Sequence, residues 1–417
     1  MTPALRRTRR SVACAALACV LACAGAAVQA AAGASHPAAP ASTALRTADG
    51  AEARLLEVYA LIGQGRQAEA LARAGQLARA WPTFQAAQLV HADLLALRLP
   101  PAGRRAVEQR LQAPGAAEAL RSLRDESARR LEALRHRPAP GTVPAQLLAV
   151  PASSRYALAV DVSRSRMYVL RNTRQGLELA ADYYVSLGKA GAGKRVEGDA
   201  RTPLGVYHVT SNLPARTLPD FYGAGALPLN YPNAYDRRAG RTGSGIWLHG
   251  SPPEQYARAP LATDGCVVLA DNDLRQLLRM ADVGATVVTI APRLDWIPQA
   301  EARVQAQALR RQVLAWNEAR AEGDLRRWQS FYLPDAVRAG RLGQQRPALR
   351  DELAQTAARG RPIELKDVSV LRWRDERQEL MVVNFGEVPR GERTGASRRQ
   401  YWLHAPGGWK IFHEEWL

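Results

Sequence analysis

Hydrophobic and polar positions divide the chain into a helical part and a β-rich part. Between residues 51 and 135, apolar side chains recur every three to four residues, and no stretch alternates like a strand. The Gly63-Gln64-Gly65 turn and the Trp81-Pro82 boundary separate helices within this part. Their placement is typical of a tetratricopeptide-type helix pair, although a generic helical bundle fits one such unit equally well. We therefore predict an all-α region over 51–135.

The pattern changes after residue 150. Short runs rich in β-branched and aromatic residues are separated by turns, at 156–162, 166–172, 182–188, 205–211, 245–250 and 285–291. One clear helical stretch, DNDLRQLLRM at 271–280, lies among them. We predict a β-rich domain over 151–292, which is a usual length for a single hydrophobic core.

The last part of the chain, 300–417, combines both patterns. A helical stretch, 306–333, precedes four strand-like runs. The runs are 367–374, 379–388, 401–405 and 409–417. The Pro-Gly-Gly between the last two runs is typical of a β-hairpin turn. Helices followed by an antiparallel sheet predict an α+β domain. The unpatterned, Pro-containing stretches 31–50 and 136–150 are predicted to be linkers, which makes the chain multidomain.

Residues 1–30 have the pattern of a removable signal peptide. Four arginines precede an alanine-rich apolar run that ends in Val-Gln-Ala at Ala30. An uncleaved membrane anchor is the alternative, and Leu21-Ala22-Cys23 loosely resembles the acylation site of a lipoprotein. No second apolar stretch approaches the length of a transmembrane helix. We expect an exported protein that is periplasmic or associated with the cell envelope.

The charge of the chain is strongly positive but not concentrated. The formal net charge is +18, and loss of the four arginines in 1–30 would lower it to +14. Only four of the 57 basic residues are lysines, and the arginines are scattered through every segment. A nucleic-acid-binding surface would instead concentrate them on one stripe among aromatic residues. We expect no nucleic-acid partner, and an anionic envelope polymer as the more suitable one.

Removal of the leader would leave Cys266 as the single cysteine, within ATDGCVVL. A lone thiol in an oxidising compartment points to reactivity. His249 lies seventeen residues upstream, at the end of a strand-like run, where an imidazole could raise the thiolate fraction. Gly265 would let backbone N–H groups approach an oxyanion, and the Gly250 carbonyl could orient the imidazole. The structural alternative is a buried cysteine and an unrelated core histidine.

Three motifs add to this pattern: TPLGVY at 202–207, LNYPNAYDRRAGRTGSGIWLHG at 229–250 and LHGSPPEQYARAPLATDGCVVL at 248–269. With them, the segment from Tyr156 to Pro292 resembles the YkuD-type catalytic domain of L,D-transpeptidases. The second motif, with the DNDL after the cysteine strand, is similar to the branch that contains the L,D-carboxypeptidases of helical cell shape.

The resemblance implies a role for each matching residue. It makes Cys266 the nucleophile, His249 the general base, Gly250 the residue whose carbonyl orients that base, and Gly265 the oxyanion glycine. Two positions depart from the family pattern. Asp264 stands where transpeptidases usually have histidine, and is expected either to hold a substrate amine or to be a solvated cap of the turn. Val268 stands where they usually have arginine, which puts acceptor crosslinking in doubt.

The resemblance also implies a reaction on peptidoglycan stem peptides. Cys266 would attack the carbonyl of the third stem residue and release D-alanine. An amine would resolve the thioester in L,D-transpeptidation, and water in L,D-carboxypeptidation. A non-catalytic wall-binding scaffold and a thiol peptidase of another fold are the alternatives. Residues of the branch-matching segments are expected to line the substrate site or to form a surface loop with local ion pairs: Arg201, Tyr231, Asn233, Asp236, Arg237 and Arg241.

The other motifs give weaker evidence about function. GKAGAGK at 188–194 fits a phosphate loop, but Arg195 follows it and no helical pattern does, so no nucleotide is expected. His249, Asp264 and Cys266 lack a fourth metal ligand, so neither a metal nor another cofactor is expected. Residues 300–417 resemble a nuclear transport factor 2-like domain, which implies a glycan or envelope partner. His404 and His413 in that part are expected to pack structurally.

Overall fold

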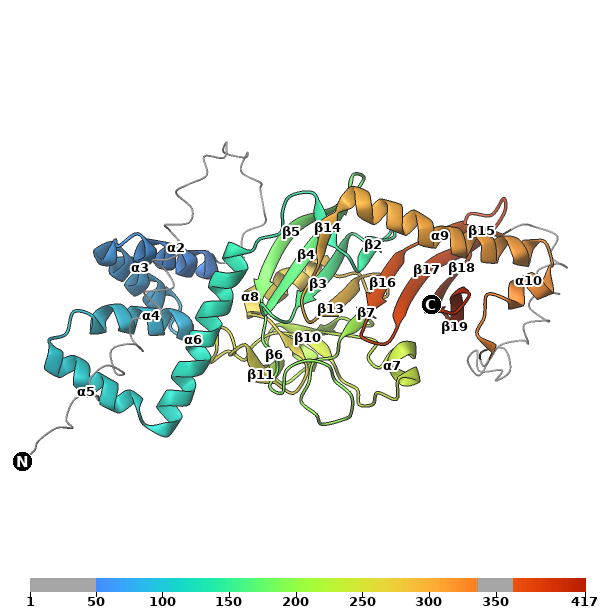
Figure 1. Cartoon of the computed structure of the whole chain (residues 1–417). Coiled ribbons are helices and arrows are strands. Elements are labelled where there is room, and N and C mark those ends of the chain that lie inside the picture. The colour runs from blue at the N-terminus through green and yellow to red at the C-terminus, as the bar shows by residue number, and fades with distance from the viewer. Residues whose placement is uncertain (1–49, 335, 337–362) are drawn as a thin grey trace, which may run out of the picture.

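The computed structural model describes residues 50–334, 336 and 363–417. The expected signal peptide, Cys23 and all but the last residue of the 31–50 linker lie outside the described residues. Helices and strands are segregated along the chain, with a helical region at one end and two β-rich regions beyond it (Figure 1). Within the described ranges, no helix is both long enough and apolar enough to cross a membrane.

The N-terminal region is helical, as its apolar spacing predicts. Its core is formed by small and aliphatic side chains with Phe84 among them, and their spacing places one stripe of each helix inward. Two of its helices begin at a proline, which suits the first helical turn. The tetratricopeptide arrangement stays a prediction. The helices are α2 Ala51–Gly63, α3 Gln67–Ala80, α4 Gln85–Ala96, α5 Pro101–Leu111 and α6 Pro114–Arg135.

A five-stranded sheet forms the frame of the central β-rich region. Its strand order is β5-β4-β3-β13-β7, and only β3 and β13 run parallel. Side chains on both faces of these strands are buried, which explains why the sequence reads as continuous apolar runs. The strands are β3 Tyr156–Asp161, β4 Arg166–Thr173, β5 Gly176–Tyr184, β7 Gly205–His208 and β13 Val287–Ala291.

A second sheet, of order β12-β10-β9-β8, lies beside this frame and carries the cysteine segment. Its strands are β8 Leu213–Pro214, β9 Gly225–Pro228, β10 Trp247–His249 and β12 Val267–Val268. A short parallel pair, β6 Leu187–Gly188 and β11 Leu261–Thr263, adjoins them. Two helices complete the region, α7 Ala234–Arg238 and α8 Asp271–Met280; the second has the bounds that the sequence predicts.

The C-terminal region is a six-stranded sheet with helix α9 along it (Figure 1). The order is β19-β18-β17-β16-β2, and β15 also pairs with β17. The elements are α9 Gln299–Ala321, α10 Leu325–Gln329, β15 Ile363–Lys366, β16 Val370–Arg374, β17 Glu379–Pro389, β18 Ala396–Ala405 and β19 Gly408–Trp416. A β-rich C-terminal region is thereby confirmed, and its nuclear transport factor 2-like character stays a prediction.

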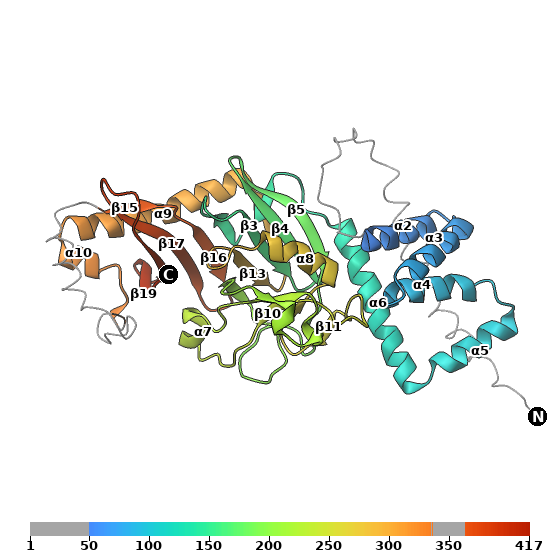
Figure 2. The ribbon, with the colours of Figure 1, turned by 180° about the vertical axis from the view of Figure 1, so that it is seen from behind.

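The predicted linker over 136–150 is wrong. It contains β1 Thr142–Pro144, which pairs with β14 Trp296–Pro298, and β2 Leu147–Ala149, which pairs with β16. Leu147 and Leu148 are buried in a hydrophobic core that takes side chains from both the five-stranded and the six-stranded sheet. The two β-rich regions therefore share one core, and Figure 2 shows them side by side from behind.

Candidate active site

Parallel pairing of β10 with β12 brings the histidine and cysteine segments together. Leu248 is opposite Val267, and His249 is opposite Val268. Continued by one residue, this register places Cys266 opposite Trp247. Because alternate residues of a strand share a face, the side chains of His249 and Cys266 lie on the same face in diagonal positions. The strand register thus places both side chains on one face of the sheet, which is the arrangement that their predicted roles require.

The imidazole of His249 is held in one tautomer. Its Nδ1 lies 2.7 Å from the carbonyl oxygen of Gly250, which can only accept a hydrogen bond, so Nδ1 carries the proton and Nε2 is left as the base. The ring is buried and packs against Phe221 and Tyr222, with centroids 5.9 and 5.0 Å away. Burial lowers the pKa of His249 to about 4, although the Gly250 carbonyl opposes this shift. The imidazole is therefore neutral at pH 7 and can accept a proton.

Gly250 is held by neighbouring residues. The Gly250 N–H donates to the Tyr222 carbonyl at 3.0 Å. The carboxylate of Asp271 accepts from the Ala224 N–H at 2.9 Å, and its Oδ1 lies 2.0 Å from where a Cβ of residue 250 would be. Asp271 opens the DNDL segment noted in the sequence, but no pattern there showed that it would contact Gly250. The structure adds Asp271 as a neighbour of the glycine whose carbonyl orients His249.

The thiol of Cys266 is partly exposed and donates to the Gly245 carbonyl at 3.4 Å. Burial raises its pKa, and the Trp247 N–H and the positive charge of Arg258 partly counter this effect. The thiol is thus protonated at neutral pH, so attack requires removal of its proton. A neutral imidazole on the same face of the sheet is suited to remove it.

A threonine closes the turn before the cysteine. The Thr263 hydroxyl accepts from the Gly265 N–H at 3.0 Å and donates to the Cys266 carbonyl at 2.8 Å. The Gly265 N–H is therefore bonded to Thr263 in this structure, and a role of Gly265 at an oxyanion stays a prediction. Position 265 needs glycine for space, because its φ is +126° and a Cβ there would lie 2.7 Å from the Arg201 carbonyl oxygen. A threonine two residues before a turn N–H is a known local signal, and could have identified Thr263 from the sequence.

Asp264 and Val268, which depart from the family pattern, differ in their exposure to solvent. Asp264 is exposed, and its carboxylate pairs with Lys189 at 2.6 Å. This contact fits a solvated turn, with the lysine in the position that a substrate amine would need. Val268 is buried in β12, so that strand offers no cation to a substrate.

The expected substrate residues Tyr231, Asn233 and Arg241 are engaged within the fold. The Tyr231 hydroxyl donates to the Thr242 carbonyl at 3.0 Å. Asn233 caps α7 by accepting from the Asp236 N–H, and its amide donates to the Val206 carbonyl, both at 3.0 Å.

Arg241 bonds Asp236 at 2.8 Å and lies 3.7 Å from Asp375 of the C-terminal region. These contacts support the loop and join two regions, which fits the alternative of a surface loop with local ion pairs; contact with substrate stays a prediction. Two further residues of that group, Arg201 and Arg237, donate to the carbonyls of Ala192 and Pro232.

Lys194 of the phosphate-loop-like stretch, His404 and His413 contact other side chains of the fold. Lys194 of the phosphate-loop-like stretch donates to Asp199 at 2.8 Å, and the residues after it form no helix. His404 packs on Trp409, and His413 on Tyr401. Among the residues that the structure describes, no three His, Cys, Asp or Glu side chains are grouped to hold a metal ion.

Comparisons with known proteins agree with this geometry. The family model of the L,D-transpeptidase catalytic domain, YkuD, matches residues 155–290. Similar solved structures include Bd1075 from Bdellovibrio bacteriovorus, with 25% identity and a TM-score of 0.54 over 66% of this chain and 98% of that one. The helical cell shape determining protein Pgp2 from Campylobacter jejuni has 18% identity and a TM-score of 0.50, over 65% and 95%.

No curated protein sequence matches the chain. The Pgp2 likeness concerns the fold alone, whereas the family match covers the segment that contains His249 and Cys266. Residues 155–290 of this chain therefore match the catalytic domain of the L,D-transpeptidase family, YkuD.

Proposed function

We propose that the chain is a peptidoglycan-modifying cysteine enzyme that acts on the stem peptide. The observation that carries the proposal is the His249 Nδ1 contact with the Gly250 carbonyl at 2.7 Å, within a domain that matches the transpeptidase family. This contact leaves Nε2 as a base on the same face of the sheet as Cys266. A scaffold that only bound the wall would have no need of this arrangement.

In the proposed first step, Nε2 of His249 removes the thiol proton as Sγ of Cys266 attacks the carbonyl of the third stem residue. The Sγ–C bond forms, the C–N bond to D-alanine breaks, and the D-alanine amine leaves with the proton from His249. The product is a thioester on Cys266. No cofactor takes part in this step.

In the proposed second step, the amine of another stem peptide attacks the thioester and gives an L,D-crosslink. Water is the second candidate acceptor and would give a tripeptide. The buried Val268 favours water, because β12 lacks the cation with which transpeptidases usually meet the acceptor strand. A likeness in fold to a helical cell shape determining protein is consistent with either outcome and suggests a role in cell shape.

Incubation of the purified chain with disaccharide tetrapeptide, followed by mass separation of the products, tests the proposal. Loss of D-alanine that disappears in Cys266→Ala is the expected result. Tripeptide alone would identify a carboxypeptidase, and a crosslinked dimer a transpeptidase. Absence of any product from the intact chain would contradict the proposal and favour the alternative of a non-catalytic wall-binding scaffold. Binding of the intact chain and of Cys266→Ala to isolated peptidoglycan would then test that alternative. An envelope localisation, and a C-terminal region that binds an envelope partner, belong to the same proposal.

A further inference from the structure

The loop of residues 251–260, between β10 and β11, is held against the edge of the central sheet. The Tyr184 hydroxyl donates to the Arg258 carbonyl at 2.9 Å, and the Leu187 N–H donates to the Pro260 carbonyl at 2.8 Å. Within the loop, the Ser251 hydroxyl donates to the Tyr256 carbonyl at 3.0 Å. The backbone on both sides of residue 258 is thus fixed by side chains and by neighbouring backbone.

The helical region holds the same loop from the other side. The Tyr256 N–H donates to the Thr83 carbonyl at 3.1 Å, between α3 and α4. The rings of Tyr256 and Phe84 lie 4.2 Å apart at their centroids, and Phe84 is buried in the helical core. The 251–260 loop therefore depends on the helical region for part of its packing.

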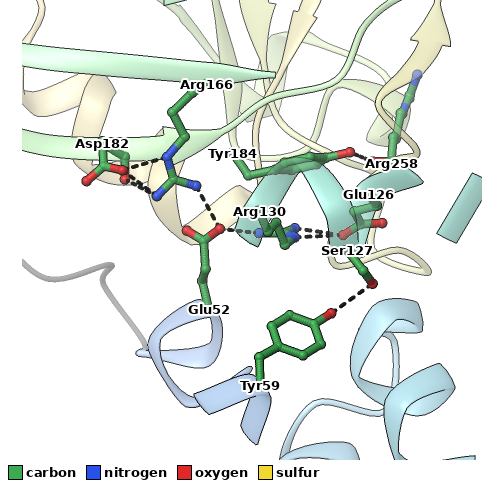
Figure 3. Close-up of polar contacts among 9 residues, drawn as sticks. All are labelled: Glu52, Tyr59, Glu126, Ser127, Arg130, Arg166, Asp182, Tyr184 and Arg258. Atoms are coloured by element: carbon green, nitrogen blue, oxygen red, sulfur yellow. Dashed lines mark hydrogen bonds and ion pairs between the residues drawn. The ribbon is translucent and has the colours of Figure 1, made fainter. Parts of the chain in front are cut away.

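A buried cluster of charges fixes the helical region to the sheet at this place (Figure 3). Glu52 of α2 accepts from Arg130 of α6 at 2.5 Å and from Arg166 of β4 at 2.7 Å. The guanidinium of Arg130 also lies 3.9 Å from the ring centroid of Tyr184, whose hydroxyl bonds the Arg258 carbonyl. A continuous set of contacts therefore joins the helices to the backbone of residue 258, as Figure 3 shows.

The side chain of Arg258 lies beside the candidate catalytic pair. Its guanidinium lies 4.2 Å from the ring centroid of Phe221, the ring that packs on His249. Its positive charge lowers the pKa values of both Cys266 and His249, after the larger effects of burial and backbone hydrogen bonds.

The donors of this guanidinium are largely unused. Among the described residues no carboxylate forms an ion pair with Arg258, and its single guanidinium hydrogen bond is to the Phe221 carbonyl at 3.4 Å. A stacked, partly exposed arginine with unused N–H groups is suited to bind a planar carboxylate through two hydrogen bonds.

We propose that Arg258 binds a carboxylate of the peptide substrate beside Cys266, and that the helical region holds Arg258 in this position through the 251–260 loop. The identification of the ligand as a peptide carboxylate rests on the proposed function. Tyr256 is a positioning residue in this scheme, because it acts through Arg258.

Alkylation of Cys266 in the full-length chain tests the carboxylate site without peptidoglycan. Iodoacetate and iodoacetamide both transfer a two-carbon group to sulfur and release iodide, but only iodoacetate carries a carboxylate. The ratio of their rates cancels changes in thiol ionisation. We expect Arg258→Gln to lower the iodoacetate-to-iodoacetamide ratio about fivefold, the size of one charge–charge contact at about 4 Å between groups fully exposed to water. We expect Arg258→Lys to retain part of it.

Arg174→Gln is the matched control, because it removes the same charge from an exposed turn between β4 and β5. It should leave the ratio unchanged. An unchanged ratio in Arg258→Gln, or an equal fall in Arg174→Gln, would overturn the proposal.

Tyr256→Ala tests whether the helical region positions Arg258 through the 251–260 loop. The ratio should fall in this variant, and the Tyr256→Ala/Arg258→Gln pair should show no fall beyond that of Arg258→Gln alone. A purely structural loss would slow both reagents equally and leave the ratio as it was, and that result would overturn the positioning role. A ratio in the double variant that falls by the product of the two single effects would also overturn the positioning role of Tyr256.

Tetrapeptide turnover separates this proposal from the proposed function. If the intact chain turns over tetrapeptide, Arg258→Gln should raise KM for a substrate with a free terminal carboxylate and leave KM for the C-terminal amide unchanged. If the intact chain shows no turnover while the alkylation ratio still falls in Arg258→Gln, the proposed function fails and the carboxylate site stands. Turnover with equal KM effects on both substrates contradicts the Arg258 site alone.

Discussion

Oδ1 of Asp271 lies so close to Gly250 that a Cβ at position 250 would be 2.0 Å from it. Position 250 cannot carry a side chain unless the Asp271 carboxylate or the end of β10 moves. Movement of the strand end would displace the carbonyl that fixes His249. The glycine after the histidine is therefore explained by packing as well as by hydrogen bonding.

Gly250→Ala should lower tetrapeptide turnover about 100-fold, since general base catalysis by an oriented histidine is of this order. Product formation by the purified variant is the measurement. The Gly250→Ala/Asp271→Ala double variant should recover part of the activity, because it removes the atom that the new methyl group meets. Full activity in Gly250→Ala would show that this contact does not orient the base.

Thr263→Val should loosen the turn that presents Cys266. Valine has nearly the same shape but can neither accept from the Gly265 N–H nor donate to the Cys266 carbonyl, so one buried and one partly buried backbone group lose their partner. We expect a loss of about 1–3 kcal/mol in the free energy of unfolding. We also expect slower alkylation of Cys266 by iodoacetamide. Thr263→Ser keeps the hydroxyl and should remain close to the wild type in both measurements.

Glu52→Gln should weaken the attachment of the helical region. Burial alone would raise the pKa of Glu52, but the charges and hydrogen bonds of Arg166 and Arg130 lower it to about 2. The carboxylate therefore stabilises the fold fully above its unfolded pKa of 4.5, and this stabilisation is lost as the pH falls from there towards 2. Removal of the charge leaves two buried guanidinium groups with one partner fewer, at a cost of about 3–5 kcal/mol.

Chemical denaturation of the Glu52→Gln variant at pH 7 measures this cost. The exposed residue Glu118 of α6 offers the matched control, Glu118→Gln, which should change the free energy of unfolding little. Equal stability of the two variants would contradict a structural role of the buried cluster.

His208 should make stability depend on pH between 7 and 5. It is buried where β7 meets the C-terminal sheet; its Nε2 accepts from the Asn384 amide at 3.0 Å, and its Nδ1 has no hydrogen-bond partner among the described residues. Burial, with the nearby charge of Arg399, lowers its pKa well below 6.5. The unfolded chain therefore binds a proton below pH 6.5 that the folded chain does not bind.

The free energy of unfolding should consequently fall below pH 6.5, by up to about 1.4 kcal/mol per pH unit from this group. Denaturation midpoints of the wild type and of His208→Gln at several pH values measure the slope, which should be smaller in the variant. His404→Gln changes an exposed histidine and should keep the wild-type slope. Identical slopes in the wild type and His208→Gln would contradict the prediction.

Local features of this chain could be predicted from its sequence, because they depend on neighbouring residues. Periodicity predicts the helix at 271–280 and the strand-like runs. The motif around Cys266 singles out that residue, His249 and Gly250. Long-range pairings were not readable. Glu52 and Arg166 are 114 residues apart and lie in unrelated patterns, so nothing local indicates that their charges meet.

The substrate residues illustrate the same limit. Tyr231, Asn233 and Arg241 are polar residues in a motif-bearing loop, which suggested contact with substrate. In the structure their side chains bond within the fold, and Arg241 forms an ion pair with Asp375 of the C-terminal region. Arg258 lies in a loop without periodicity, and its place beside Cys266 depends on contacts from the helical region.

The pairing of β2 with β16 means that one sheet contains a strand made before the catalytic strands and a strand made after them. The ribosome makes Leu147 before the catalytic strands and Leu371 after them, although the two side chains share one core. A nascent chain therefore carries the Cys266 thiol before the sheet that supports its domain can close. Premature termination would release a polypeptide with an open apolar edge, and not a shorter working enzyme.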